Sequence, residues 1–267
     1  MNRSAETWLR ARELADTRSR NELLARQFCQ HLRPDTTVID LGCGGAANLR
    51  YLSRFLRVEQ PCLGIDHDPD ILACAAEHLR TPSVQFRRLD LARHLSHLPR
   101  GPQTAFTASA FLDLASQDFL IRFVELARET PLLIAMTASG TPRWDPVETE
   151  FETTAIDEFL SAHRRSDHGF GPSVGYDAAD RLSELLSAAG CSVTTVQTDW
   201  NLDFRDATLI RLLIDGIANR LASLKCDLDI NRWRERRLQL LADAVLVCTV
   251  PHRDLLSIPP GRGGTEQ

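Results

Sequence analysis

A glycine-rich segment near residue 42 has the residue types and the spacing of a ligand-binding loop. Gly42 and Gly44 follow a short apolar run that contains one carboxylate, Asp40. Glycine lets the backbone pass close to a ligand, and the first turn of the helix that follows offers unpaired N–H groups. Asp66 ends the next apolar run, where a carboxylate can accept hydrogen bonds from both hydroxyls of a ribose. The pattern predicts a nucleotide-like ligand at the carboxyl ends of parallel strands.

The glycines alone fit two classes of cofactor. Gly42-x-Gly44-x-x-Ala47 together with Asp66 also fits a nicotinamide dinucleotide site. Asp40 argues against that class, because a carboxylate inside the strand would repel a pyrophosphate, whereas a cationic amine would tolerate it. An NAD(P)-dependent oxidoreductase with a Rossmann fold therefore stays open as the alternative interpretation of this loop.

Two further features weigh against the oxidoreductase. Asp90 and Leu91 follow the third apolar run, where they offer a carboxylate to an adenine amino group and an apolar contact to the ring. Lys225 is the only lysine and residue 221 is leucine, so the chain has no Tyr-x-x-x-Lys pair. Both features favour an adenosine ligand that is not a dinucleotide.

From about residue 37 onward, apolar runs that predict strands alternate with amphipathic stretches that predict helices. Strands are expected at 37–41, 62–65, 84–89, 104–109, 132–137, 191–198 and 244–250. Helices are expected at 46–55, 68–79, 117–128, 177–190, 205–224 and 229–241. This alternation predicts the α/β fold class: a doubly wound, mostly parallel sheet with helices on both faces.

The remaining segments flank or interrupt this pattern. Residues 1–33 are expected to form an N-terminal helical cover, broken near residues 16–19, where Ser19 and Glu22 fit a capping box. The main domain is then 34–258, and its insertions 138–176 and 205–241 are interpreted as a lid over an acceptor. The tail, 259–267, is rich in proline and glycine and is expected to be disordered.

Three motifs in order resemble those of the class I (Rossmann-like) S-adenosylmethionine-dependent methyltransferases: Val38–Gly44, Gly64–Pro69 and Phe86–Asp90. The resemblance covers residues 36–136 well. It implies a seven-stranded sheet whose last strand is antiparallel, with a helical insert between the last two strands. It also implies S-adenosyl-L-methionine as the cofactor and a methyl acceptor as the second substrate. A methyltransferase-like binding protein without turnover is a further alternative.

The resemblance also implies roles for individual residues. It places Asp66 on the ribose, Asp90 and Leu91 at the adenine, and the backbone of Gly42–Gly44, which includes Cys43, against the methionine portion. The sequence departs from the family at Ala46, where a third glycine is usual and which suits a slightly less tight turn. It departs again at the start of the fourth strand, which often carries Asp where this chain has Thr104.

Four more residues are candidate cofactor contacts. Asn48 lies on the first turn after the loop and can contact the methionine end, while His67 can flank the adenine. Arg18 lies in the break between the N-terminal helices, where a guanidinium can pair with the cofactor carboxylate in bidentate geometry; a solvated arginine is an equally open interpretation. Ser109 ends the fourth strand, in the segment that lines the gap between cofactor and acceptor in the family.

The acceptor side is less specific, and the sequence identifies no catalytic residue. Asp113 is a weak candidate for a base or an acceptor-binding group, and the alternative is a carboxylate that caps a turn. Aromatic residues and histidines in or beside the irregular stretches can form an acceptor pocket: Trp144, His163, His168, Phe170, Tyr176 and Trp200. The histidine spacing matches no metal signature, so no metal is expected.

The amino-acid composition limits the kinds of partner that the protein is expected to bind. The 267 residues include 31 Lys+Arg and 36 Asp+Glu, for a net charge of −5, which argues against a nucleic-acid coat or binding to an anionic membrane. Seven cysteines without a CxxC pair predict free thiols in a reducing compartment. No apolar signal segment begins the chain, so a cytoplasmic location is expected. The predicted acceptor is a small molecule with an O, N or C nucleophile, and the protein is expected to be a monomer or homodimer.

Overall fold

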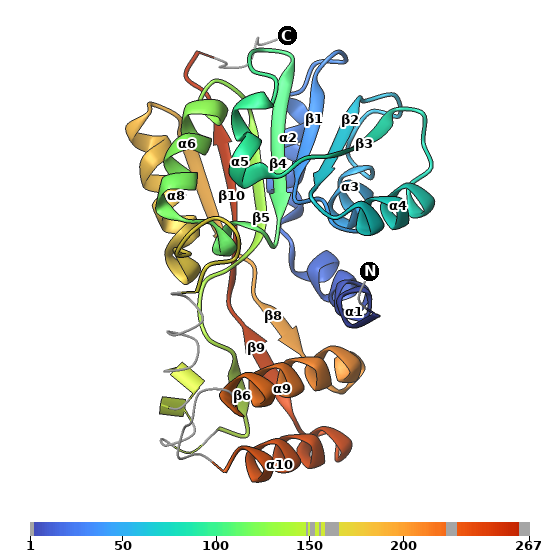
Figure 1. The fold of residues 1–267 in the computed structure, drawn as a ribbon, viewed down its shortest axis with the longest axis vertical. Coiled ribbons are helices and arrows are strands. Elements are labelled where there is room, and N and C mark those ends of the chain that lie inside the picture. Colours follow the sequence, from blue (N-terminus) through green and yellow to red (C-terminus); the bar gives the residue numbers. More distant parts are fainter. Residues whose placement is uncertain are drawn as a thin grey trace.

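A seven-stranded sheet forms the centre of the computed structural model, which describes residues 3–147, 149, 153–154, 156–157, 166–222 and 229–261, with side chains from residue 7 onward. The strands are β1 (Thr37–Leu41), β2 (Cys62–Asp66), β3 (Val84–Arg88), β4 (Thr104–Ser109), β5 (Leu132–Ala138), β7 (Ser192–Gln197) and β10 (His252–Ile258). Their order is β3-β2-β1-β4-β5-β10-β7 (Figure 1). β1 to β5 pair in parallel, whereas β10 is antiparallel to both β5 and β7. The predicted α/β sheet with one antiparallel strand is therefore confirmed.

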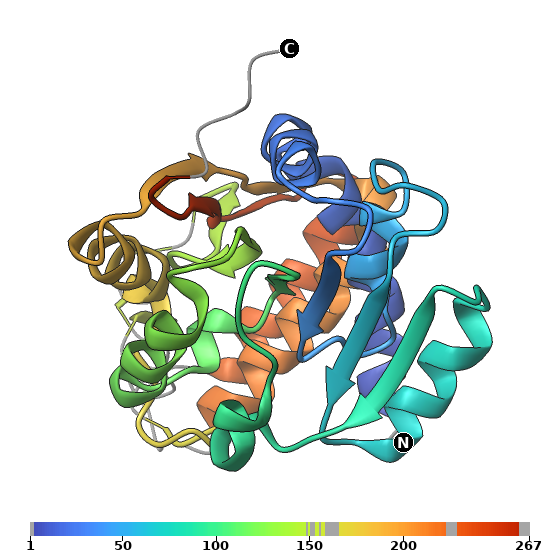
Figure 2. The same cartoon turned by 90° about the horizontal axis from the view of Figure 1, so that it is seen from above.

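Helices cover both faces of this sheet (Figure 2). One face packs against α5 (Leu91–His94), α6 (Gln117–Ala127) and α8 (Ala178–Ala188). The other packs against α2 (Glu22–Gln30), α3 (Ala47–Leu52) and α4 (Pro69–His78). Because both faces are covered, the inner strands are mostly buried, as in the run Leu132–Met136 of β5.

A second, smaller sheet lies beyond the end of the central one, where β6 (Arg143–Asp145), β9 (Val247–Val250) and β8 (Trp200–Leu202) pair antiparallel in that order. α9 (Ala207–Ala222) and α10 (Ile230–Ala242) pack on it around a core of their own. We call these five elements the small lobe. α1 (Arg3–Ser19) lies beside β8 and contacts both β8 and α9 (Figure 1).

Two sequence expectations about these elements are wrong. The apolar run 244–250 was expected to be the last strand of the main sheet, but it supplies β9 of the small lobe, and β10 takes the place in the main sheet. The predicted capping box at Ser19 does not form, because α1 runs through Ser19. Asn21 is the N-cap of α2 instead, and its side chain accepts a hydrogen bond from the N–H of Leu24 at 2.9 Å.

Three smaller points concern the rest of the chain. Among the described residues, no helix is long and apolar enough to cross a membrane. The six described cysteines are free thiols, and Cys226 lies outside the described residues. The tail expected to be disordered is described only as far as residue 261, and much of the predicted insertion 138–176 also lies outside the described residues.

Candidate functional site

The glycine loop after β1 turns sharply through three left-handed residues. Gly42, Gly44 and Ala46 have φ angles of 62°, 50° and 63°. A Cβ on Gly42 would stand 2.7 Å from the ring of Phe111, so both conformation and space require glycine there. Ala46 was expected to relax the turn. It instead adopts the same left-handed φ as the glycines, so the turn stays tight and a non-glycine residue carries the strain.

A cavity of about 430 Å³ opens between this loop and α1. The residues of the loop and of the sheet ends that line it are Asp40, Gly42, Cys43, Gly44, Gly45, Ala47, Asn48, Ser109 and Ala110. Six of these were predicted cofactor contacts: Asp40, Gly42, Cys43, Gly44, Asn48 and Ser109. The cavity therefore lies at the carboxyl ends of β1 and β4, where an α/β sheet binds ligands.

Asp40 is the most unusual group at this cavity. It is fully buried, and its Oδ1 accepts a hydrogen bond of 2.6 Å from Nδ2 of Asn48, which also donates to Oγ1 of Thr107 at 3.0 Å. Oδ2 of Asp40 and Oδ1 of Asn48 are buried and have no hydrogen-bond partner in the described chain. Burial raises the pKa of Asp40 to about 7, although the Asn48 hydrogen bond and the charge of Arg20 oppose this shift. Two buried acceptor atoms next to the glycine loop thus have no donor among the described residues.

Asp66 ties the end of β2 to the glycine loop. Its Oδ2 accepts a hydrogen bond from the N–H of Gly44 at 3.0 Å, and its Oδ1 accepts one from the N–H of Asp68 at 3.1 Å. Nδ1 of His67 lies 3.2 Å from the same Oδ1, and the His67 side chain is 82% exposed. Each carboxylate oxygen has two lone pairs, so Asp66 keeps acceptor capacity beyond these contacts.

The other predicted cofactor contacts have structural partners. Asp90 is the N-cap of α5, where its Oδ1 accepts a hydrogen bond from the N–H of Ala92 at 3.0 Å. Leu91 is buried in the core on that face of the sheet. Arg18 forms an ion pair of 2.6 Å with Asp206, and it lines a separate surface hollow with Gln197. These three side chains, and also Asp66 and His67, are not among the residues that line the cavity beside the loop.

Two predicted acceptor residues are core residues of the small lobe. Trp144 and Trp200 are 5% and 2% exposed. Trp144 packs edge-on against Trp233, with 6.5 Å between ring centroids. Phe170 likewise packs against the ring of Phe119, with centroids 4.9 Å apart. For these side chains the structure shows packing, and His163 lies outside the described residues.

Three other predicted acceptor residues come together although 63 residues separate the outermost two. Asp113 lies on a short 3-10 helix, Leu112–Leu114, that packs against a second one, Gly175–Asp177, which carries Tyr176. Burial raises the pKa of Asp113, while the charges of Arg12 and His168 lower it. Burial and the charge of Asp113 raise the pKa of Tyr176. Asp113, His168 and Tyr176 thus form one electrostatically coupled group, with Arg12 of α1 beside it.

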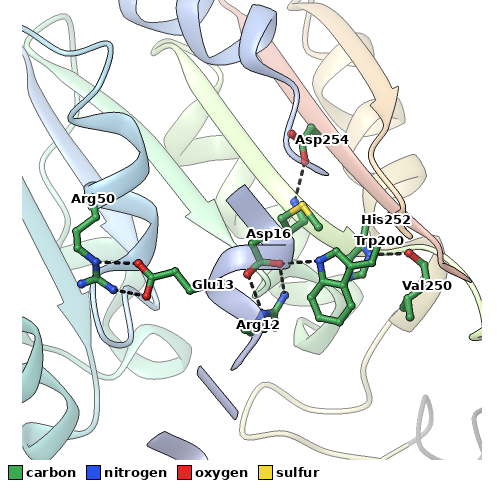
Figure 3. Close-up of polar contacts among 9 residues, drawn as sticks. Arg12, Glu13, Asp16, Arg50, Trp200, Val250, His252 and Asp254 are labelled. Carbon is green, nitrogen blue, oxygen red and sulfur yellow. Dashed lines mark hydrogen bonds and ion pairs between the residues drawn. The ribbon is translucent and has the colours of Figure 1, made fainter. Parts of the chain in front are cut away.

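α1 forms a wall of the cavity that was not predicted from the sequence. Five of the α1 side chains that line it are Trp8, Leu9, Arg12, Glu13 and Asp16. Nε of Arg12 donates to Asp16 at 2.9 Å, and the guanidinium carbon lies 5.9 Å and 5.0 Å from the ring centroids of Trp8 and Trp200. Nε1 of Trp200 also donates to Asp16 at 2.9 Å (Figure 3). The helical spacing of Trp8, Arg12 and Asp16 was the available signal, because it places all three on one face.

An ion pair connects α1 to the helix that follows the loop. Nε and Nη2 of Arg50 donate to the two carboxylate oxygens of Glu13 at 2.9 Å and 2.8 Å (Figure 3). Nη1 of Arg50 donates to the carbonyl of Gly45 at 2.5 Å. Arg50 therefore holds the glycine loop and α1 together at the edge of the cavity. Within the described ranges, no cluster of three His, Cys, Asp or Glu side chains is arranged to hold a metal.

Of the comparisons with known proteins, the one with solved structures finds proteins of similar fold. No protein-family model matches the sequence, and no match was found among curated proteins. Among solved structures, a cyclopropane-fatty-acyl-phospholipid synthase-like protein from Lactobacillus casei is 16% identical, with a TM-score of 0.55 over 97% of this chain and 94% of its own. A cyclopropane synthase from Mycobacterium tuberculosis is 12% identical, with a TM-score of 0.50 over 88% of this chain and 82% of its own.

A third solved structure, a protein from Bacillus halodurans provisionally assigned as a methyltransferase, is 15% identical, with a TM-score of 0.50 over 87% of this chain and 95% of its own. At these identities the likeness is one of fold. The strand order, the single antiparallel strand and these three likenesses lead to one conclusion: the chain has the Rossmann-like fold of the class I S-adenosylmethionine-dependent methyltransferases.

Proposed function

We propose that the protein is an S-adenosylmethionine-dependent methyltransferase that acts on a small-molecule acceptor with an O, N or C nucleophile. The observation that carries the proposal is the pair of unpartnered acceptor atoms, Oδ2 of Asp40 and Oδ1 of Asn48, beside the glycine loop. In a sheet of this order, the glycine loop lets the cofactor approach the backbone, and Asp66 would accept hydrogen bonds from its ribose hydroxyls. The unpartnered oxygens of Asp40 and Asn48 would accept hydrogen bonds from its cationic end.

Several features support the fit of this cofactor. A buried carboxylate without a donor favours a cation nearby, and the cofactor has both an ammonium and a sulfonium. Asp16 and Glu13 also line the cavity, but each is paired with an arginine, so Asp40 is the carboxylate there that would disfavour a pyrophosphate. Asp66, held by the N–H of Gly44, has lone pairs left for the ribose hydroxyls. When bound, the cofactor supplies an electrophilic methyl group.

The group of Asp113, His168 and Tyr176 is the proposed acceptor site. Asp113 follows Ser109 and Ala110 closely in the chain, and these two residues line the cavity at the end of β4. Burial shifts the pKa of Asp113 upward, which makes the carboxylate a better proton acceptor near neutral pH. Asp113 would take the proton from a nucleophile that must lose one. The wall of the cavity would contribute chiefly by holding the acceptor in line with the methyl group.

Calorimetry tests the cofactor. Wild-type protein is expected to bind S-adenosylmethionine and S-adenosylhomocysteine, and NAD much more weakly. Asp66→Ala removes the proposed ribose acceptor, and Gly44→Val forces a β-branched residue into a left-handed position, so both are expected to bind far more weakly. Asp35→Ala, which removes a surface carboxylate bonded to Gln103, serves as the control and is expected to bind normally. NAD binding without binding of either sulfur ligand would contradict the proposal.

Transfer of a tritiated methyl group tests the acceptor. Incubation of the protein and labelled cofactor with a cell extract is expected to label a small molecule. Asp113→Asn is expected to slow the transfer while leaving cofactor affinity unchanged, whereas Asp118→Asn, an exposed carboxylate on α6, should leave both unchanged. Label found only in macromolecules would contradict the small-molecule part of the proposal.

A further inference from the structure

A second hollow lies between α2 and the segment that follows α3, at the end of the sheet opposite to the glycine loop. It measures about 370 Å³. Gln60 lines it and donates from Nε2 to the carbonyl of Thr36, the residue before β1, whereas the glycine loop begins where β1 ends. Of the described residues, none lines both this hollow and the cavity beside the loop. We call it the arginine hollow.

The charged side chains that line the arginine hollow are all positive. They are Arg26, Arg54 and Arg57, and no carboxylate of the described chain is among the lining residues. Cys29 also lines the hollow, and burial raises its pKa to about 11 although the charge of Arg57 lowers it, so the thiol adds no negative charge at neutral pH. The whole chain has a net charge of −5, so this positive surface is a local exception that favours an anionic ligand.

Two of the three guanidinium groups have N–H donors left for a ligand. Arg26 is bonded to one oxygen of Glu22 through two of its nitrogens, at 3.0 Å and 2.5 Å. Nη2 of Arg54 lies 3.7 Å from the other oxygen of that carboxylate, which is too far for a hydrogen bond, and Arg54 forms none among the described residues. Arg57 donates from Nη1 alone, to the carbonyl of Leu32 at 2.8 Å. The remaining donors of Arg54 and Arg57 are therefore available.

Both of these guanidinium groups are already held in place. The guanidinium carbon of Arg54 lies 5.1 Å from the ring centroid of Phe55, which lines the hollow, and 5.2 Å from that of Tyr51. The bond to the Leu32 carbonyl holds Arg57. A stacked guanidinium keeps its edges free to donate, and less conformational freedom is lost when it binds. The Arg54 side chain is 49% exposed, so a ligand can reach its donors from solvent.

We propose that the arginine hollow binds a small polyvalent oxyanion of the diphosphate class. Each guanidinium presents a planar fork that matches the edge of a phosphate group, and two available forks beside one hollow suit two linked phosphates. The volume of the hollow is that of a small-molecule site. The side-chain amide of Gln30, which also lines it, can donate a further hydrogen bond. This site is separate from the proposed methyl transfer and goes beyond it.

Calorimetric titration with inorganic pyrophosphate tests the site, at constant ionic strength because salt screens exposed charges. Wild-type protein is expected to bind pyrophosphate. Arg54→Gln and Arg57→Gln are each expected to weaken binding by roughly tenfold, since each removes a charged hydrogen-bonded contact. Arg54→Lys keeps the charge but loses the planar fork, so its loss is expected to be smaller, about threefold. Thermal unfolding checks that every variant remains folded.

A second ligand distinguishes two sources of the same chemistry. Uridine diphosphate has the same two linked phosphates on a nucleoside. Tighter binding of uridine diphosphate than of pyrophosphate would support the site and identify a nucleotide as its ligand. Equal binding would support the site and show that the phosphates alone are recognised.

Two further variants serve as controls. Arg122→Gln removes an exposed arginine on α6, on the other face of the sheet, whose guanidinium donates to backbone carbonyls. Pyrophosphate affinity is expected to stay unchanged in this variant. Gly44→Val alters the glycine loop, the other place where a phosphate could contact the backbone, and it is also expected to leave pyrophosphate affinity unchanged.

A loss confined to the Arg54 and Arg57 variants supports the inference. Three results would overturn it: no binding of either diphosphate by wild-type protein at millimolar concentration, an equal loss in Arg122→Gln, or a loss in Gly44→Val with normal binding in Arg54→Gln. None of these results depends on whether the protein binds S-adenosylhomocysteine, so failure of this inference and failure of the proposed function are distinguishable.

Discussion

The buried carboxylate of Asp254 accepts a hydrogen bond of 2.9 Å from the N–H of Asn21, and this contact joins β10 to the break between α1 and α2. The other carboxylate oxygen accepts from the N–H of Met136 at 2.8 Å and from Oγ1 of Thr198 at 3.1 Å. Met136 has a left-handed φ of 53°, and the pairing of β10 with β5 shifts register next to Asp254. One carboxylate thus connects β10 to β5, to the segment after β7 and to the break between α1 and α2.

Replacing this carboxylate is expected to be strongly destabilising. Asp254→Asn keeps the shape but turns an amide NH₂ toward N–H donors, which leaves at least one buried donor without an acceptor. The expected loss is about 3 kcal/mol in the free energy of unfolding, measured by urea denaturation. Asp243→Asn, at the exposed end of α10, is the control and is expected to stay within about 0.5 kcal/mol of wild type. Equal stability of the two variants would show that Asp254 is not the anchor.

The raised pKa of Asp40 predicts how ligand affinity depends on pH. Asp40 is protonated below about pH 7, while Arg20 favours its ionised form and Asp66 disfavours it. An ammonium ligand needs the ionised form, so S-adenosylhomocysteine is expected to bind more tightly as the pH rises to about 7, by at most about tenfold per unit, and to level off above it. Methylthioadenosine, which has the adenosine but not the ammonium and carboxylate of the amino-acid end, should show no such rise.

The Asp40→Asn variant tests whether Asp40 itself causes this pH dependence of ligand affinity. The variant is expected to lose the pH dependence and to bind S-adenosylhomocysteine weakly throughout. Because the folded pKa of Asp40 lies above its unfolded value, ionisation costs stability as the pH rises from about 4 to about 7. The asparagine variant should therefore gain stability relative to wild type across that window. A constant difference between the two proteins from pH 4 to 8 would argue against a buried, titrating Asp40.

The ion pair between Glu13 and Arg50 is expected to slow ligand release. Both side chains are about one-third exposed, so their contribution is modest, but the pair joins α1 to the helix behind the loop at the cavity edge. Glu13→Gln is expected to raise the dissociation rate of S-adenosylhomocysteine by roughly two- to tenfold in stopped-flow measurements, with little change in fold stability. Arg26→Gln, which breaks a surface pair with Glu22, is the control. Unchanged release in Glu13→Gln would show that α1 does not retain the ligand.

Two glycine replacements are expected to have opposite effects on stability. A Cβ on Gly64 in β2 would stand 2.6 Å from the ring of Phe86 and 3.0 Å from Sγ of Cys43 in the glycine loop. Gly64→Ala is therefore expected to cost about 1–3 kcal/mol. Gly216 lies inside α9 with open space around it, so Gly216→Ala should stabilise by about 1 kcal/mol. Thermal unfolding of the two variants measures both, and a stabilised Gly64→Ala would contradict the packing described at the loop.

The sequence predicted the first five strands and the loop because each depends on local pattern. An apolar run followed by glycines and an acidic residue after the next run can be recognised without tertiary information. The last strand could not be found in this way. Arg253 and Asp254 interrupt its apolar pattern, and Asp254 is buried only because donors from three other segments converge on it. The run 244–250 has a more uniform apolar pattern and was therefore predicted as the last strand, but it belongs to the smaller sheet.

In the candidate site, too, only the residues that depend on local sequence pattern could be predicted. Asp40, Gly44 and Asn48 could be placed at the cavity because they lie within a few residues of one turn. That Arg18 pairs with Asp206 instead of lining the cavity could not be predicted, since it depends on which way the helix break faces. A contact with Asp254, 233 residues away, sets that direction. The role of α1 as a cavity wall was likewise invisible, because an amphipathic helix does not identify the surface that it covers.

The small lobe continues the strands of the central sheet. Short connections lead from β5 into β6, from β7 into β8 and from β9 into β10, so neighbouring strands of one sheet extend into neighbouring strands of the other. An engineer who wished to exchange this lobe for that of another protein would have to preserve the register at these three junctions and also rejoin the chain where it returns from β6 to α8. The small lobe is therefore built as an extension of the central sheet, and it cannot be exchanged as an independent module.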